Sequence, residues 1–374
     1  DFGSSIVTLI EEGLALDLRG NTTNLTVLNT SAVLNFTNTD DIVVEVGAIA
    51  KTIPTMRFIN CSGSIEIITG SVEDNTNRIT FGDIEVLIDG VEFIIDSNND
   101  DSNIKTYGSV TLPNNCRYII GSGDGTGGYG GTDHTIFNDD FIVGNGGQGD
   151  MHGRYVEFLS DFIIGEDSDC RFSRDVQFQG DFSVNGTDLA HIILDQDAEF
   201  AGNLNFSGTN IVRIDGETNI AGDLNIADDG NLTLQNNGGA ATTSILGSIN
   251  LGAESIIDIG GGEIGDFTID AIDLLNEAQL NINTNTSITT INDLTLSSFN
   301  IVRFNTSAVT NITGTLSSVG LCDIWLWLRS LNDGETADVN FSSLQTVTSN
   351  ICQDINVTSL NMTNTAGVDL SNNS

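Results

Sequence analysis

The sequence predicts an all-β fold: a single parallel β-solenoid of about 14–16 coils. The main observation is a short phrase, Gly-Asp-Phe-Ser-Val at 180–184, that recurs in altered form. Neighbouring copies are roughly 16 to 31 residues apart, which suits one unit of a stacked repeat protein. Composition agrees, because helix-favouring Lys and Arg number only 12 whereas Gly numbers 41. Further copies begin at residues 63, 82, 108, 140, 161, 202, 222, 247, 265, 293, 314, 338 and 354.

Each copy of the phrase has a turn residue followed by apolar, polar and apolar residues. This alternation places the apolar side chains on one face of a strand. Gly and Asp before the strand favour a bend, since Gly tolerates positive φ and Asp hydrogen-bonds nearby backbone. A longer match relates residues 204–214 to residues 294–304, at an offset of 90 residues. We therefore expect two strands per copy there, and about four turns of 22 residues between the two segments.

Taken in order, residues 1–40 are expected to form an N-terminal cap or the first coils. Residues 41–374 are expected to form the solenoid, with a Gly-rich loop insertion at 115–155. Two stretches, 6–18 and 270–280, are the only ones that tolerate a helix. The segment 321–329 places Trp325 and Trp327 on one side of a strand and aliphatic residues on the other. Either burial of one face or an aromatic patch on the outer face agrees with this pattern.

The net charge is −40, with 52 acidic and 12 basic residues. No basic patch is present to neutralise phosphates, so a nucleic-acid partner is not expected. Membrane insertion is not expected either, since no run of about 18 apolar residues occurs. The acidic residues favour solubility, and the alternative is that divalent cations bridge carboxylates of neighbouring copies.

The five cysteines occur without any CxxC or Cys/His cluster, so a zinc site is not expected. Cys322 and Cys352 are the disulfide candidates, because their spacing of 30 residues is a little over one coil. Burial as reduced thiols is the alternative.

Asn-x-Ser/Thr sequences are frequent and are candidates for glycosylation, or for Asn ladders stacked along the coil corners. The candidate positions are Asn21, Asn24, Asn29, Asn35, Asn60, Asn185, Asn205, Asn231, Asn285, Asn305, Asn311, Asn340, Asn356 and Asn361.

The Gly-rich stretches at 121–134 and 144–153 are the most chemically mixed part of the chain. No Gly-Lys-Ser/Thr follows them, which excludes a P-loop. The segment 127–133 nearly matches a calcium-binding Gly-Gly-x-Gly-x-Asp repeat, so Asp124, Asp133 and Asp150 are candidate calcium ligands. The two His residues of this region, at 134 and 152, lack a nucleophile elbow or an HExxH sequence. We therefore assign no catalytic residue, no enzymatic activity and no further cofactor.

The coil phrase and the Asn/Thr/Ser-rich corners resemble parallel β-helix proteins of cell surfaces, such as surface-layer or sheath proteins and autotransporter-adhesin passenger regions. The resemblance covers about residues 24–370 as a pattern and implies an extracellular or cell-surface location. We expect a non-enzymatic structural protein that self-assembles with other copies into a surface layer, sheath or filament. The alternatives are an adhesin that binds cell-surface glycan and a polysaccharide-acting β-helix enzyme.

Overall fold

A computed structural model gives the structure of the chain. It describes residues 6–9, 15–17, 33–37, 41–46, 51–59, 63–69, 78–97, 104–121, 134–153, 155–237, 241–260, 265–284, 288–318, 326–332, 335–348, 350–353 and 355–363. These residues form an all-β parallel β-solenoid, without a helix in the described ranges. The chain divides into two compact units, unit 1 (Asp1–Ser183) and unit 2 (Val184–Ser374).

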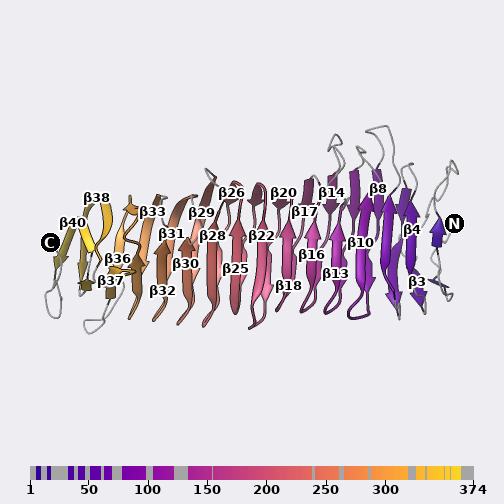
Figure 1. Cartoon of the computed structure of the whole chain (residues 1–374), viewed down its shortest axis with the longest axis horizontal. Coiled ribbons are helices and arrows are strands. Elements are labelled where there is room, and N and C mark those ends of the chain that lie inside the picture. Colours follow the sequence, from indigo (N-terminus) through magenta and orange to yellow (C-terminus); the bar gives the residue numbers. More distant parts are fainter. Residues whose placement is uncertain are drawn as a thin grey trace. The chain divides into compact units, whose positions relative to one another are not determined.

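In unit 1, a typical turn has two strands in sheet A and one strand in sheet B (Figure 1). The strands of sheet A are β1 (Ile6–Leu9), β3 (Val33–Thr37), β5 (Lys51–Ile53), β6 (Thr55–Ile59), β8 (Arg78–Phe81), β9 (Ile84–Val86), β11 (Ile104–Tyr107), β12 (Val110–Leu112), β14 (His134–Phe137), β15 (Phe141–Val143), β17 (Tyr155–Phe158), β18 (Phe162–Gly165), β20 (Asp175–Phe178) and β21 (Phe182–Asn185), where the units divide. The strands of sheet B are β2 (Ala15–Asp17), β4 (Ile42–Val46), β7 (Ile65–Thr69), β10 (Glu92–Ser97), β13 (Arg117–Ile120), β16 (Gln148–Met151) and β19 (Asp169–Phe172).

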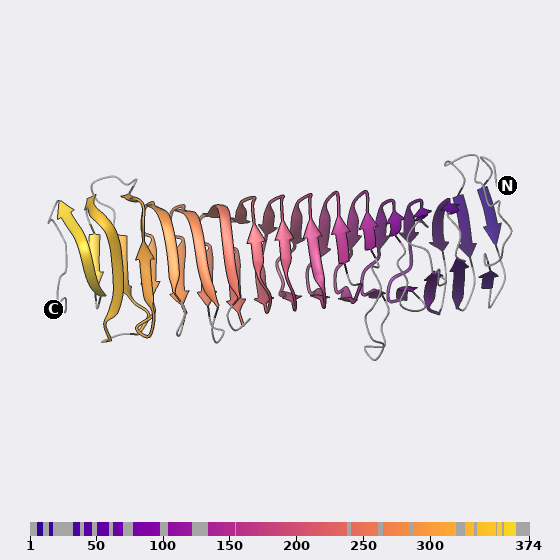
Figure 2. The same cartoon turned by 90° about the horizontal axis from the view of Figure 1, so that it is seen from above.

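Unit 2 repeats this arrangement, and its sheet A includes the long strands β29, β31, β33, β38 and β40 (Figure 2). The strands of sheet A are β23 (Ala198–Phe200), β24 (Leu204–Phe206), β26 (Thr218–Ile220), β27 (Leu224–Ile226), β29 (Thr242–Leu251), β31 (Asp266–Leu274), β33 (Thr289–Leu296), β35 (Val309–Ile312), β36 (Leu316–Ser318), β38 (Ala337–Thr348) and β40 (Ile355–Thr363). The strands of sheet B are β22 (Ala190–Leu194), β25 (Thr209–Ile214), β28 (Asn231–Asn236), β30 (Ile256–Gly260), β32 (Gln279–Asn283), β34 (Ile301–Phe304), β37 (Leu326–Ser330) and β39 (Asn350–Gln353).

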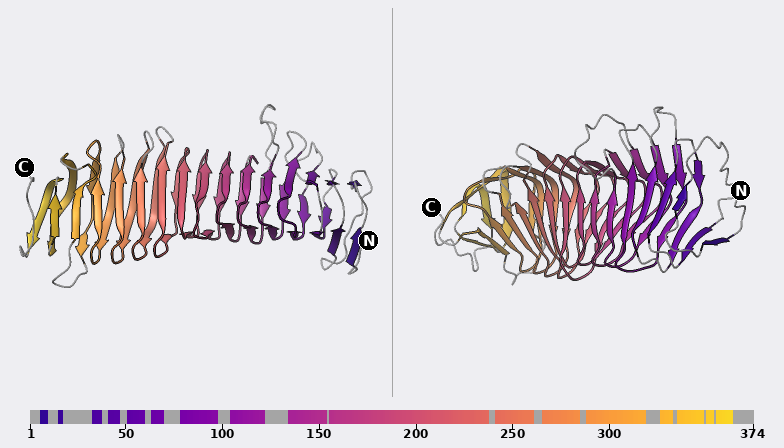
Figure 3. Two further views of the ribbon diagram at one scale, coloured as in Figure 1. Left: turned by 60° about the horizontal axis from the view of Figure 1, so that its bottom comes forward. Right: turned by 45° about the vertical axis from the view of Figure 1, so that its right-hand side comes forward.

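Successive turns within each unit pair in parallel, and equivalent strands follow one another in the same direction (Figure 3). In unit 2 the register runs from Leu204 to Leu224, then to Ile249, Ile272 and Leu294. Residues 204 and 294 are thus four turns apart, as the 90-residue offset predicted. Most copies of the Gly-Asp phrase begin the second strand of a turn in sheet A, at β9, β12, β15, β18, β21, β24 and β27.

The core of unit 1 contains a column of aromatic side chains on consecutive turns. Phe81, Tyr107, Phe137, Phe158 and Phe178 stack with ring centroids 4.6, 5.3, 5.0 and 5.1 Å apart. All five side chains are almost fully buried. Stacking of this kind adds to the free energy gained from burying the rings, so the column ties each turn to the next.

The predicted solenoid is confirmed, and the 15 strands of sheet B, one in a typical turn, agree with the predicted 14–16 coils. Other sequence-based expectations have different outcomes. The stretch 270–280 is not helical but joins β31 to β32 through a corner, and residues 6–9 and 15–17 are strands. The range 115–155 of the predicted loop insertion contains the four strands β13 to β16 and the first residue of β17. Residues 122–133 and 154 lie outside the described residues, so the insertion stays a prediction.

The two units divide at residue 183. The cap or first coils expected at residues 1–40 stay a prediction. The described residues of that range form β1, β2 and β3, and β3 pairs in parallel with β6 of the next turn. In the Trp-containing segment, Leu328 points into the core and Trp327 is half-buried on the opposite face of β37. Trp325 lies outside the described residues.

Candidate functional site

Acidic and amide side chains link successive turns at the bend between the two strands of sheet A. In unit 1, Asp161 accepts a hydrogen bond from the backbone N–H of Asp181 at 2.9 Å. In unit 2, Asn203 accepts from the N–H of Asp223 at 2.9 Å, and Asp223 accepts from Ser248 at 2.8 Å. Each bond satisfies a backbone donor of the following turn at a point where the strand ladder is interrupted. The Asp of the recurring phrase therefore links one turn to the backbone of the next.

The Gly of the phrase leaves the space that this bond needs. A Cβ atom on Gly247 would lie 2.3 Å from the carbonyl oxygen of Gly222 and 2.7 Å from Oδ1 of Asp223. A Cβ atom on Gly108 would likewise lie 2.5 Å from Oδ1 of Asp83, whose carboxylate accepts from the N–H of Ser109 at 2.9 Å. The sequence predicted a bend here, but the close approach between turns is the stronger reason for glycine.

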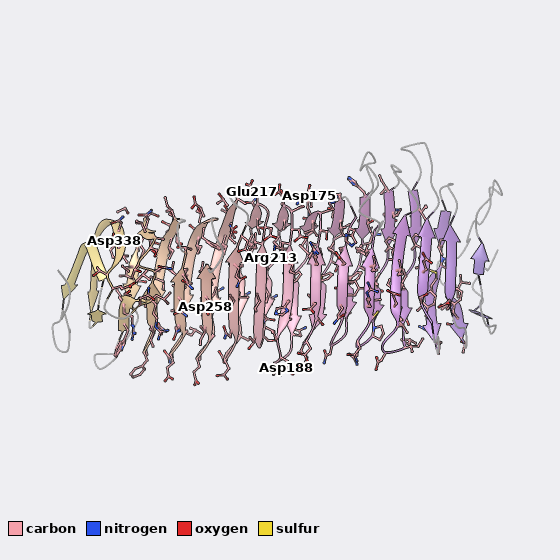
Figure 4. All side chains as sticks on the ribbon, viewed as in Figure 1. Asp175, Asp188, Arg213, Glu217, Asp258 and Asp338 are labelled. Atoms are coloured by element: carbon pink, nitrogen blue, oxygen red, sulfur yellow. The ribbon has the colours of Figure 1, made fainter. Side chains whose placement is uncertain are left out.

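A second corner, between sheet A and sheet B, is built in a similar way. Asp89 accepts from the N–H of Asn114 at 3.1 Å, and Asn114 accepts from Asn145 at 2.9 Å. In unit 2, the Asp228 carboxylate accepts a hydrogen bond from the N–H of Ala253 at 2.8 Å. Figure 4 shows acidic side chains of unit 2 at opposite edges, with Glu217 above and Asp188 below the face that carries Asp258. Much of the charge is therefore displayed along the corners.

The most mixed group of side chains lies in unit 1, where β16 and β19 end and β17 begins. Asp150 lies on β16 in register with Arg171 of β19. Its Oδ2 atom is 3.1 Å from Nε2 of His152, and its Oδ1 atom accepts a hydrogen bond from the Ser173 hydroxyl at 3.0 Å. We call Asp150, His152, Arg171 and Ser173 the Asp150 cluster.

The environment of Asp150 favours its ionised form. Partial burial acts to raise the pKa of this carboxyl group, but His152, by hydrogen bond and charge, acts in the opposite direction. The hydrogen bond from Ser173 and the charge of Arg171 act with His152, and together they hold the pKa of Asp150 below its ordinary value. The cluster therefore keeps a carboxylate in place across two turns.

In sheet A of the same unit, His134 of β14 stacks on Tyr155 of β17, with ring centroids 4.6 Å apart. The two residues are in register on adjacent turns. The sequence drew attention to His134, His152 and Asp150, but it did not indicate Tyr155 or Ser173. Only knowledge of the register could have found them, because they lie 21 residues or more further along the chain.

The hydrogen-bond pattern of the Asp150 cluster differs from that of an acyl-transfer triad. In a triad the serine donates to the histidine, and the histidine in turn is oriented by the carboxylate. Here Ser173 donates to Asp150 instead, so the hydroxyl and the imidazole share one carboxylate. The arrangement can position side chains and bind a polar ligand, but it does not activate Ser173 as a nucleophile.

The structure describes one of the three candidate calcium ligands. Asp124 and Asp133 lie outside the described residues, and Asp150 engages His152 and Ser173. Among the described residues, no group of three or more His, Cys, Asp or Glu side chains is close enough to hold a metal ion. The calcium site at Asp124, Asp133 and Asp150 thus stays a prediction.

Two cysteines of unit 1 are buried as free thiols. Burial raises the pKa of both Cys116 and Cys170 to about 12, so neither is a thiolate at neutral pH. The predicted disulfide partners cannot be placed in the same way. Cys322 lies outside the described residues, and the backbone of Cys352 is in register with Leu328. That disulfide stays a prediction.

The candidate glycosylation sites differ in accessibility. Asn185 and Asn340 are exposed, and Asn35, Asn205, Asn231 and Asn311 are half-buried. Asn305 is buried, donates to Asn283 at 2.9 Å and accepts from the N–H of Ser307 at 2.8 Å. Its amide is therefore fully engaged in the folded chain. The candidates outside the described side chains are Asn21, Asn24, Asn29, Asn60, Asn285, Asn356 and Asn361.

An Asn ladder is present on the outer face of sheet A in unit 2, within the strands β24, β27 and β29 and not at a corner, where the sequence suggested such ladders. The Asn225 amide donates to Asn205 at 2.9 Å, and the Asn250 amide donates to Asn225 at 2.8 Å. Such ladders add side-chain hydrogen bonds parallel to the backbone ladder. Asn205 is thus both a glycosylation candidate and the first member of a ladder.

Comparisons with protein families, curated proteins and solved structures found no match. The resemblance to cell-surface β-helix proteins therefore rests on the repeat pattern and the solenoid fold. In the part of the chain that the structure describes, no helix is long and apolar enough to cross a membrane.

Proposed function

We propose that this protein is a non-enzymatic, extracellular structural protein that assembles with other copies of itself into a surface layer, sheath or filament. The observation that carries the proposal is the repeated use of corner side chains to link turns. Asp161 and Asp223 show the pattern in the two units, each binding the backbone of the following turn. A protein built in this way resists local opening along its length, which suits a load-bearing or protective wall.

Assembly has to overcome electrostatic repulsion between copies. A net charge of −40 repels a second copy at low salt, and this repulsion is screened over a Debye length of about 8 Å at physiological ionic strength. Divalent cations reduce it further by binding carboxylates of two copies at once. We therefore propose that assembly is promoted by calcium or a similar cation.

Electron microscopy of the purified native protein tests this proposal. At physiological salt with added calcium we expect ordered sheets, tubes or filaments, and with a chelator at low salt we expect fewer and shorter assemblies. Dispersed single particles under every condition would contradict the assembly function. Ordered assemblies that form equally well with the chelator would support the assembly function and contradict the role of the cation.

A binding module is the second candidate, and the stack of His134 on Tyr155 favours it. Aromatic side chains on the outer face of adjacent turns offer flat surfaces against which sugar rings pack. In this case the solenoid would act as a stalk that presents the Asp150 cluster and its neighbours to cell-surface glycan. Single particles that bind glycan, with binding lost in Tyr155→Ala, would support this candidate over assembly.

A further inference from the structure

Phe299 of unit 2 combines two unfavourable features. Its backbone adopts a φ of 60°, in the left-handed region that a bulky side chain rarely occupies. Its side chain is also 48% exposed, so burial in the chain's own core does not explain the aromatic ring. A residue held in a strained conformation, with its apolar side chain in solvent, points to a role in binding.

The same corner position recurs in the three preceding turns, and acidic residues occupy it there. Asp229, Glu254 and Glu277 have φ values of 60°, 59° and 64°. Each donates its backbone N–H to the corner of the next turn, at 2.9 Å to Ala253, 3.1 Å to Asn276 and 2.8 Å to Ser298. The four residues Asp229, Glu254, Glu277 and Phe299 therefore form one continuous edge.

A second apolar side chain lies on this edge. Leu275 occupies the corner one turn before Phe299 and is 57% exposed. The buried Asn300 amide, next to Phe299, donates to the carbonyl oxygens of Leu275 and Ala278, which holds the two corners together. We call Asp228, Asp229, Glu254, Leu275, Glu277 and Phe299 the unit 2 edge.

The charge of the unit 2 edge is of one sign. Its corners at 227–230, 252–255, 275–278 and 297–300 contain four acidic residues and no Lys or Arg. The surface therefore offers a row of carboxylates that ends at two exposed apolar side chains. A ligand that complements it needs positive charges and an apolar group at one end.

We propose that the unit 2 edge is a docking surface for a basic polypeptide segment of a partner protein, with an apolar side chain that packs on Phe299 and Leu275. Charge complementarity decides this choice of occupant. The edge carries only carboxylates, so the segment that fits it is rich in Lys or Arg, which number only 12 in this chain against 52 acidic residues. This docking function goes beyond the proposed assembly and does not depend on it.

Titration of the full chain with two synthetic peptides tests the proposal. One peptide repeats Lys-Lys-Leu, and its counterpart of the same length repeats Lys-Lys-Ser. We expect the wild-type chain to bind the leucine peptide more tightly, and Phe299→Gly to weaken that binding about fivefold to tenfold. Phe299→Gly should also raise the melting temperature by about 2–4 °C, because glycine relieves the left-handed strain.

Leu246→Ser is the matched control, because Leu246 is 62% exposed on β29 at the bend within sheet A, not on the unit 2 edge. It should leave the affinity for the leucine peptide unchanged. Phe299→Asn serves as a second variant, since Asn tolerates the left-handed region. Equal binding of the leucine peptide by wild type, Phe299→Gly and Phe299→Asn would overturn the proposal. So would a change in self-association, measured by sedimentation, without any change in peptide binding.

Discussion

Replacing Gly149 with alanine is expected to lower the free energy of unfolding of unit 1 by about 3 kcal/mol or more. Gly149 lies on β16 in register with Tyr118 of β13. A Cβ atom added to Gly149 would lie 1.8 Å from Cζ of Tyr118, so it would overlap the hydroxyl end of the ring. The ring is fully buried and approaches Cys170, which is the residue in register with Gly149 on the other side. The tyrosine thus spans the space that Gly149 leaves empty.

Urea-induced unfolding of the full chain, followed by circular dichroism, measures this effect. Gly153→Ala is the matched control, since its added Cβ would meet Val156 at 3.1 Å and needs only a small shift. In a double-mutant cycle, Tyr118→Ala should cancel most of the cost of Gly149→Ala, because the ring that causes the clash is gone. If Gly149→Ala were no more destabilising than Gly153→Ala, the placement of Tyr118 over Gly149 would be wrong.

Replacing Phe158 with alanine is expected to lower the free energy of unfolding of unit 1 by about 4–5 kcal/mol. The Phe158 ring is fully buried and stacks on Phe137 and Phe178, at centroid distances of 5.0 and 5.1 Å. It also meets Phe162 edge to face at 4.7 Å. Removing it leaves a cavity in the middle of the column and ends the stacking on both sides.

Leu159, the next residue along the chain, provides a matched control for Phe158. Leu159 is 44% exposed, so Leu159→Ala should cost less than about 1 kcal/mol in the same unfolding measurement. Phe158→Leu should fall between the two, because leucine refills part of the cavity but cannot stack. Similar losses for Phe158→Ala and Leu159→Ala would show that the aromatic column does not stabilise unit 1.

The fold was predictable because its signal repeats. The phrase at Gly180, Gly202 and Gly222 combines a turn residue with alternating apolar residues, and each copy begins a strand of sheet A. The 90-residue match even gave the number of turns between two segments. Strand alternation depends on nearest neighbours in the sequence, which is why it can be read without a structure.

The interactions between turns were harder to predict, because they depend on register. Gly149 belongs to a Gly-rich stretch that the sequence indicated as a loop, yet it lies in a strand and makes room for Tyr118. Spacings between the stacked rings of Phe81, Tyr107, Phe137 and Phe158 vary from 21 to 30 residues. Loops of different length at the corners produce this variation and hide the column in the sequence.

The candidate site was predictable only in part. The sequence singled out Asp150 and His152, but the hydrogen bond that Ser173 donates to Asp150 becomes visible only when two turns are aligned. The strain at Phe299 had no sequence signal, since Asp229, Glu254 and Glu277 at the same corner are ordinary acidic residues. A composition that is acidic throughout also concealed which carboxylates bind backbone and which face solvent.

The central claim is that the acidic residue of the recurring phrase holds one turn to the next, and hydrogen exchange of Asp223→Ala tests it most directly. We expect the amide of Ser248 to exchange faster in this variant, because it donates to Oδ1 of Asp223 at 2.8 Å in the wild-type chain. Asp223→Asn should keep the protection, since Asn203 performs the same task one turn earlier. Asp188→Ala, at an exposed position of unit 2, should leave exchange at Ser248 unchanged. Equal exchange at Ser248 in wild type and Asp223→Ala would contradict the claim.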